Sequence, residues 1–195
     1  FLIALLFLLF FIGARILIPT RTGIPYIYPL PAFGLLVSAL YGIGPAIILS
    51  IPLSILTAYG MPNAMDLTIF YMITSLCAIF ALGPARSVGA FFKAGVAIAG
   101  AGAAVILAYR IPFASWDWVG ILTLLGASAF NGAASASLAL LLQYFLAQQL
   151  GLVTPLQLLE ISRPDHPLLQ FFLRSAPGTY QHSLQVSNLA EQAAE

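Results

Sequence analysis

The residue best suited to chemistry lies near the end of the chain, at His182. Four apolar residues, Val186, Leu189, Ala190 and Ala193, follow it at the i, i+4, i+7, i+8 and i+11 spacing of one helical face. We therefore expect an amphipathic helix that turns His182 toward the core of a further domain. From the spacing alone, His182 is either a hydrogen-bonded core residue or a metal ligand. The chain stops at Glu195 in mid-helix and has no initial Met, so we expect it to be a piece of a longer protein.

Other candidates for chemistry are weaker. His166 lies in a turn between Pro164 and Pro167, where capping or solvent exposure is the default role. Cys77, the single cysteine, sits in an apolar stretch and is interpreted as a small hydrophobic residue, with no disulfide and no Cys-rich metal site.

The composition of the chain indicates the environment of the elements that position these residues. Charged residues make up 7% of the chain and hydrophobic ones 61%, whereas soluble domains carry roughly 25% charged residues. So few charges cannot cover the surface of a soluble domain, so lipid must be the solvent for most of the chain. The net charge of +1 and the lack of a basic run argue against nucleic-acid binding.

Six apolar segments approach the length of about 20 residues that a spanning helix needs. They are residues 1–18, 28–40, 43–59, 67–82, 88–109 and 118–147. The predicted fold class is all-α: a polytopic membrane bundle of about six spans over residues 1–150, then juxtamembrane helices and the start of an α-helical domain over 151–195. Gly42 predicts a tight turn that makes the second and third segments a hairpin.

Small and polar residues inside the spans predict how the helices pack. Residues 100–104 and 132–137 form small-residue faces that let helices approach closely in lipid, and such faces can also pair two copies of the chain. Asn131-Gly132, in the middle of the long last segment, marks either a break or a tight packing point. We interpret Asn131, Ser137 and Gln143 as interhelical hydrogen-bonding residues, with a transport site as the weaker alternative, because no span carries a charge at its centre.

The side of the membrane is weakly encoded. A cytoplasmic C-terminus and six spans place the N-terminus on the same side. Four basic residues then lie inside, Arg86, Lys93, Arg163 and Arg174, and three outside, Arg15, Arg21 and Arg110. This small excess agrees with the positive-inside rule.

The segment after the bundle reads as a series of capped helices. Gly151 is a predicted C-cap. Thr154 and Gln157 have the spacing of a capping box around Pro155. Pro167 is predicted to open a second short helix, and Thr179 to cap the last helix.

The motifs of this tail resemble one bacterial family, the seven-transmembrane HD-domain phosphodiesterases, which hydrolyse cyclic di-AMP. They are LLEIS (158–162), PDHPLL (164–169), APGTYQHS (176–183), NLAE (188–191) and AAE (193–195). The layout of the bundle is similar too, including Tyr28-Pro29 at the entry of the second helix.

The resemblance implies that the chain holds the last six helices of a seven-helix membrane domain, in the bacterial cell membrane, and the beginning of a cytoplasmic HD domain. It implies that His182 is the first metal ligand, even though Gln181 stands where many members have a second His. The remaining ligands of a divalent metal pair, Fe or Mn, would lie beyond Glu195. The chain alone would then be inactive, and its parent would hydrolyse cyclic di-AMP to pApA. The alternatives are a receptor with a non-catalytic nucleotide-binding HD domain, and a transporter.

Overall fold

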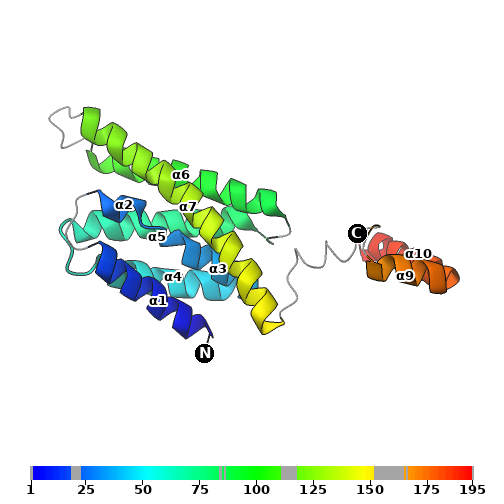
Figure 1. The fold of residues 1–195 in the computed structure, drawn as a ribbon. Helices are drawn as coiled ribbons and strands as arrows, with labels where there is room; N and C mark the ends of the chain where they lie inside the picture. The colour runs from blue at the N-terminus through cyan, green and yellow to red at the C-terminus, as the bar shows by residue number, and fades with distance from the viewer. Residues whose placement is uncertain are drawn as a thin grey trace. The chain divides into compact units, whose positions relative to one another are not determined.

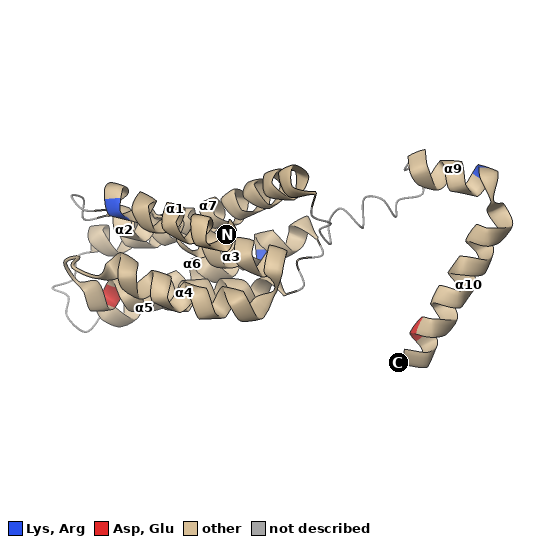
Figure 2. Ribbon diagram, turned by 90° about the horizontal axis from the view of Figure 1, so that it is seen from below, with Lys and Arg blue, Asp and Glu red and all other residues tan. Residues whose placement is uncertain are grey.

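The computed structural model describes residues 2–18, 23–83, 85, 87–110, 118–151, 165 and 167–194. All regular secondary structure in these residues is α-helical, as the composition predicts. The chain divides into two compact units, Phe1–Thr154 and Pro155–Glu195, and each is described by itself (Figure 1). Charged residues are few along the ribbon (Figure 2).

The first unit is a bundle in which all six predicted apolar segments form helices. These are α1 (Leu2–Leu17), α2 (Ile24–Ile27) with α3 (Pro31–Tyr41), α4 (Ile43–Ala58), α5 (Ala64–Leu82), α6 (Val88–Arg110) and α7 (Trp118–Leu150). Four stretches are long and apolar enough to cross a membrane: Ile24–Tyr41, α5, α6 and α7. The apolar helices α1 and α4 have 16 residues each, just under the usual minimum of about 17.

The helix predicted over residues 28–40 begins later, at Pro31, and a short helix that was not predicted, α2, precedes it. Between α2 and α3 the chain is extended: Tyr28 has φ −61° and ψ 122°. The cause is local, because Tyr28 precedes Pro29, and a residue before proline is pushed out of the helical region. Pro25 lies in the first turn of α2 and Pro31 in the first turn of α3, positions where proline is tolerated.

Helix α3 is the centre of the bundle. It contacts α1, α4, α5 and α7, and Phe33, Leu35 and Leu36 on it are fully buried. The ring of Phe33 packs edge-to-face with the rings of Phe7 and Phe10 on α1, with centroids 5.9 and 5.8 Å away. The predicted hairpin turn follows α3 at Gly42, whose φ of +92° favours glycine and lets α4 return along α3.

Helices α6 and α7 pack closely at a pair of facing glycines. A Cβ on Gly95 would lie 3.0 Å from the carbonyl oxygen of Gly132, and a Cβ on Gly132 would collide with the carbonyl oxygen of Gly95. Helix α7 runs unbroken through Asn131-Gly132. The pair is therefore a tight packing point, and the alternative of a helix break is wrong.

The small-residue face predicted over residues 100–104 divides between two environments. Gly102 packs against Phe70 of α5, whose ring carbon would lie 2.8 Å from an added Cβ, and against Ser128 of α7. Gly100 faces open space. Part of the predicted small-residue face is therefore used for packing between helices of the same bundle. Beyond it, α7 ends at Leu150 and Gly151 adopts φ +61°, which confirms the predicted C-cap.

Candidate metal-binding helix and the polar junction of the bundle

The second unit contains α9 (Pro167–Ser175) and α10 (Pro177–Ala194), and α9 begins at Pro167 as predicted. Helix α10 begins two residues before the predicted cap at Thr179. The amide of Tyr180 donates to the carbonyl oxygen of Ala176 over 3.1 Å, so the first helical bond already closes there. Pro177 opens the helix because its fixed φ suits the first helical position, where no partner for its nitrogen is needed. The capping box at Thr154 and Gln157 lies outside the described residues.

His182 lies in the second turn of α10 and is exposed. The next residue, Ser183, donates from Oγ to the carbonyl oxygen of Thr179 over 2.9 Å, which is a bond within the helix. Val186 and Leu189 on the predicted apolar face are 51% and 66% exposed. This face therefore has no cover in the described part of the unit.

A metal site needs several ligands that converge. The described residues contain no group of three or more His, Cys, Asp or Glu side chains able to hold a metal ion. His166 lies outside the described residues. A lone exposed imidazole fits one ligand of a larger site, with most of the ligand set supplied by other residues.

Asn131 of α7 makes three side-chain hydrogen bonds inside the bundle. It is fully buried, and its Nδ2 donates to the carbonyl oxygens of Tyr26 and Tyr28 over 3.1 and 3.0 Å. Its Oδ1 accepts from Oγ of Ser135 over 3.0 Å. The two carbonyls belong to the junction between α2 and α3, where the helix is interrupted. The prediction of interhelical hydrogen bonding is confirmed for Asn131, and its side chain is committed to structure.

Two tyrosines tie the same junction to other helices. The hydroxyl of Tyr28 donates to the carbonyl oxygen of Phe10 over 2.7 Å, and the hydroxyl of Tyr71 donates to the carbonyl oxygen of Pro25. Gly13 leaves room for the Tyr28 hydroxyl, since a Cβ there would lie 2.9 Å from it. Sequence reasoning missed these clamps. The available signal was the run of three prolines, which breaks a span and leaves carbonyls that buried donors must satisfy.

Ser137 and Gln143 take no part in the hydrogen bonds of Asn131. Ser137 is exposed and lines an apolar groove beside α6. Gln143 is buried, and its amide has no hydrogen-bond partner in the structure. The polar residues of α7 therefore line no common path, which removes support for a transport site built from these three.

We expect Asn131→Leu to destabilise the bundle by about 2 kcal/mol. The substitution removes two interhelical hydrogen bonds and one bond within α7, and interhelical bonds in membranes contribute about 0.6 kcal/mol on average and up to about 1.7. Unfolding of the purified protein in detergent measures the change. Ser137→Ala, on the exposed face of the same helix, is the matched control and should stay near wild type. Equal stability of the Asn131 variant and the control would show that the Asn131 hydrogen bonds do not stabilise the bundle.

The fold and these contacts define a class: a polytopic helical membrane protein with a second helical unit. Residues 1–154 match the family described as 7TM receptor with intracellular HD hydrolase. The chain belongs to this family, which confirms the resemblance seen in its tail motifs.

Three individual proteins are similar to the chain. Cyclic-di-AMP phosphodiesterase PgpH of Bacillus subtilis is 31% identical over 182 residues, covering 89% of this chain and 25% of the relative. PgpH of Listeria monocytogenes is 53% identical over 45 residues, or 23% of this chain and 6% of the relative. An uncharacterized Synechocystis protein is 33% identical over 173 residues, covering 85% of this chain and 21% of the relative. The chain thus spans a quarter or less of these relatives. No solved structure matches it.

Proposed function

We propose that the chain is the membrane part and the start of the HD domain of a metal-dependent phosphodiesterase that hydrolyses cyclic di-AMP to pApA. The observation that carries the proposal is the family match over residues 1–154, because the family is described as joining a 7TM receptor to an intracellular HD hydrolase. Two relatives named as cyclic-di-AMP phosphodiesterases support the substrate.

In this proposal residues 1–150 are the last six helices of a seven-helix membrane domain. Residues 151–195 are the cytoplasmic junction and the truncated start of the HD domain. The division into compact units at Thr154 and Pro155 supports such an organisation. The proposed partners are the lipid bilayer, cyclic di-AMP and a second copy of the chain, for which the open face at Gly100 is available.

His182 is the proposed first ligand of a divalent metal pair, Fe or Mn. Its exposure near the start of α10, on a helix face without cover, suits a residue that completes a site together with distant parts of the protein. When bound, such a pair supplies an activated water and neutralises charge on the phosphodiester. The role of this chain is to hold one imidazole on a rigid helix. A chain limited to these residues should therefore be inactive.

The bundle is proposed to anchor the enzyme and to relay a signal through α7. This helix has 33 residues without a break, and residues 151–195 follow it directly in the sequence. The word receptor in the family description favours a second candidate, a receptor whose HD domain binds nucleotide without hydrolysis. Incubating the purified full-length protein with cyclic di-AMP and Mn²⁺ or Fe²⁺ separates the two. Release of pApA supports the enzyme, whereas binding without product supports the receptor.

We expect the C-terminus to lie in the cytoplasm of a bacterial cell. The guanidinium of Arg15, at the end of α1, donates to the carbonyl oxygen of Tyr59, just after α4, over 2.8 Å. This bond supports the alternation of six spans, because the first and third spans should end on one side. A reporter fused after Glu195 should read cytoplasmic, and one inserted at Gly60 should read external. The same reading at both positions would contradict six spans.

A further inference from the structure

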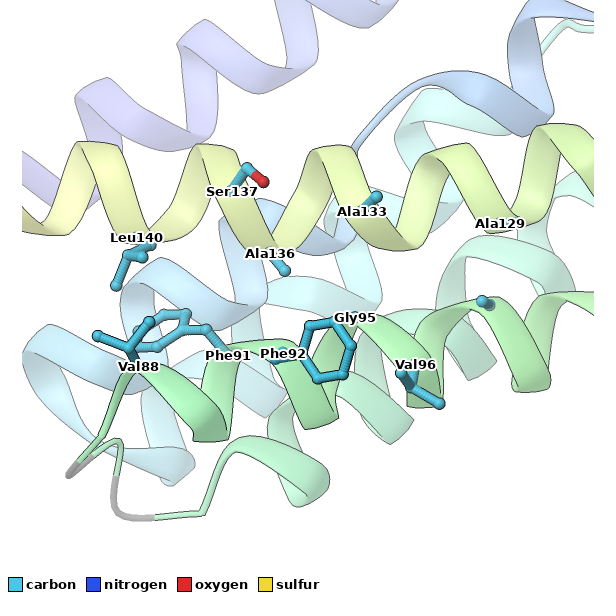
Figure 3. Close-up of a pocket in the computed structure, with 11 residues that line it drawn as sticks. Val88, Phe91, Phe92, Gly95, Val96, Ala129, Ala133, Ala136, Ser137 and Leu140 are labelled. Atoms are coloured by element: carbon cyan, nitrogen blue, oxygen red, sulfur yellow. The ribbon is translucent and has the colours of Figure 1, made fainter.

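An apolar groove runs along the outer side of the contact between α6 and α7. Its volume is about 400 Å³, and its lining residues include Val88, Phe92 and Val96 from α6 and Ala129, Ala133 and Leu140 from α7 (Figure 3). Small residues on α7 leave the space open, while larger side chains on α6 rise beside it. Of the lining residues, Ser137 has the single polar side chain.

The groove is open to the surroundings of the bundle. Phe92 is 74% exposed and Val96 is 59% exposed. Both helices are long and apolar enough to cross a membrane, so the surroundings are the hydrocarbon of the bilayer. Its occupant is therefore either a lipid chain or a helix of another protein.

The dimensions favour a lipid chain. The lining residues of α6 extend from Val88 to Ala99, a rise of roughly 16 Å at 1.5 Å per residue. This is about half of the ~30 Å hydrocarbon core, which is the depth of one leaflet. Spread over that length, the groove volume gives a mean cross-section of about 25 Å². A helix about 10 Å across has a cross-section of about 80 Å², so the groove surrounds a single acyl chain more completely than it would a helix.

A positive charge lies beside the groove. Lys93 directly follows Phe92 on α6, is exposed, and stands five residues from the start of the helix. Helical side chains slant toward the N-terminus, and lysine extends its ammonium group to the membrane interface. From its place about one turn after Val88, Lys93 is expected to extend its ammonium group toward the level of that end of the groove. Neither α6 nor α7 contains an acidic residue, so these two helices cannot neutralise the charge themselves.

We propose that the groove binds one acyl chain of an anionic phospholipid whose phosphate pairs with Lys93. The apolar walls bury the chain, and the ammonium group at the interface neutralises the headgroup. This site is independent of the proposed hydrolysis, because it uses neither His182 nor the HD domain.

Lipid retention by the full-length protein tests the proposal. The protein is reconstituted in nanodiscs of phosphatidylcholine and phosphatidylglycerol, and the lipids that stay bound after release are counted by native mass spectrometry. We expect retained phosphatidylglycerol, reduced about fivefold in Lys93→Gln, the factor for ~1 kcal/mol per basic residue at an anionic surface. Lys93→Arg should restore it. Ala133→Phe should fill the groove and abolish retention, whereas Gly100→Phe, on the open face of α6, should not.

Three results would overturn the site. The first is equal retention of both lipids by the wild-type protein. The second is retention of phosphatidylglycerol that Lys93→Gln and Ala133→Phe leave unchanged. The third is a dimer that Ala133→Phe dissociates, because it would make a second copy the occupant. Catalytic activity enters none of these measurements, so failure of the proposed enzyme function would not affect them.

Discussion

His182→Ala in the full-length protein should reduce metal-dependent hydrolysis of cyclic di-AMP by at least about 100-fold. Residues that only support a metal ligand already contribute 10- to 100-fold to affinity or activity, so loss of a ligand should have at least that effect. The same variant should retain less metal, which elemental analysis of the purified protein measures. Membrane insertion and thermal stability of the bundle should not change, because α10 belongs to the other compact unit.

Ser183→Ala is the matched control for this prediction. It removes a neighbouring hydroxyl that bonds only within α10, to the carbonyl oxygen of Thr179, and it leaves the imidazole in place. We expect near wild-type activity and metal content. A His182→Ala protein that keeps its metal and its activity would exclude His182 from the site, while loss of activity in both variants would indicate damage to the helix.

Gly132→Leu should have the largest effect on the bundle. A side chain at this position collides with the carbonyl oxygen of Gly95. Main-chain atoms cannot turn aside as a side chain does, so α6 and α7 would have to separate. Overpacking typically costs 1–3 kcal/mol, and we expect about 3 kcal/mol or more here because the obstacle is backbone. The midpoint of unfolding in detergent should fall accordingly.

Gly100→Leu controls for the general effect of replacing a membrane glycine. Nothing lies within 4 Å of the Cβ it adds, so its stability should stay within about 0.5 kcal/mol of wild type. If both variants lose stability equally, close packing at Gly132 would not be the reason for glycine at that position.

Much of the architecture could be predicted from local patterns. The apolar runs predicted six helical segments, and the turn at Gly42 and the cap at Gly151 followed from glycine's access to positive φ. Errors arose where two local signals compete. The second helix was predicted to begin at Tyr28, yet Pro29 excludes the helical conformation there and α3 begins at Pro31. The cap predicted at Thr179 gave way to Pro177, which starts α10 earlier.

The candidate site divides in the same way. His182 and its helical face were readable from spacing, because residues on one face of a helix recur with a period set by the helix itself. Its metal-binding role is a prediction that rests on family resemblance, since a ligand set is assembled from distant parts of a fold and the described residues hold no cluster. Lys93 stood out in the sequence only as a basic residue, because the groove beside it exists only once α6 and α7 pack.

The sequence by itself determined that this protein lives in a membrane and is helical, since both follow from composition and from hydrogen bonding within each segment. Only the tertiary structure decided how the helices lock together. Asn131 closes the break at Tyr26 and Tyr28, more than 100 residues away, with bonds of 3.1 and 3.0 Å. The sequence shows locally that the two carbonyl oxygens lack a helical donor and that the buried amide of Asn131 needs acceptors. Which donor pairs with which acceptor depends on the packing of all the helices together, and no local pattern encodes it.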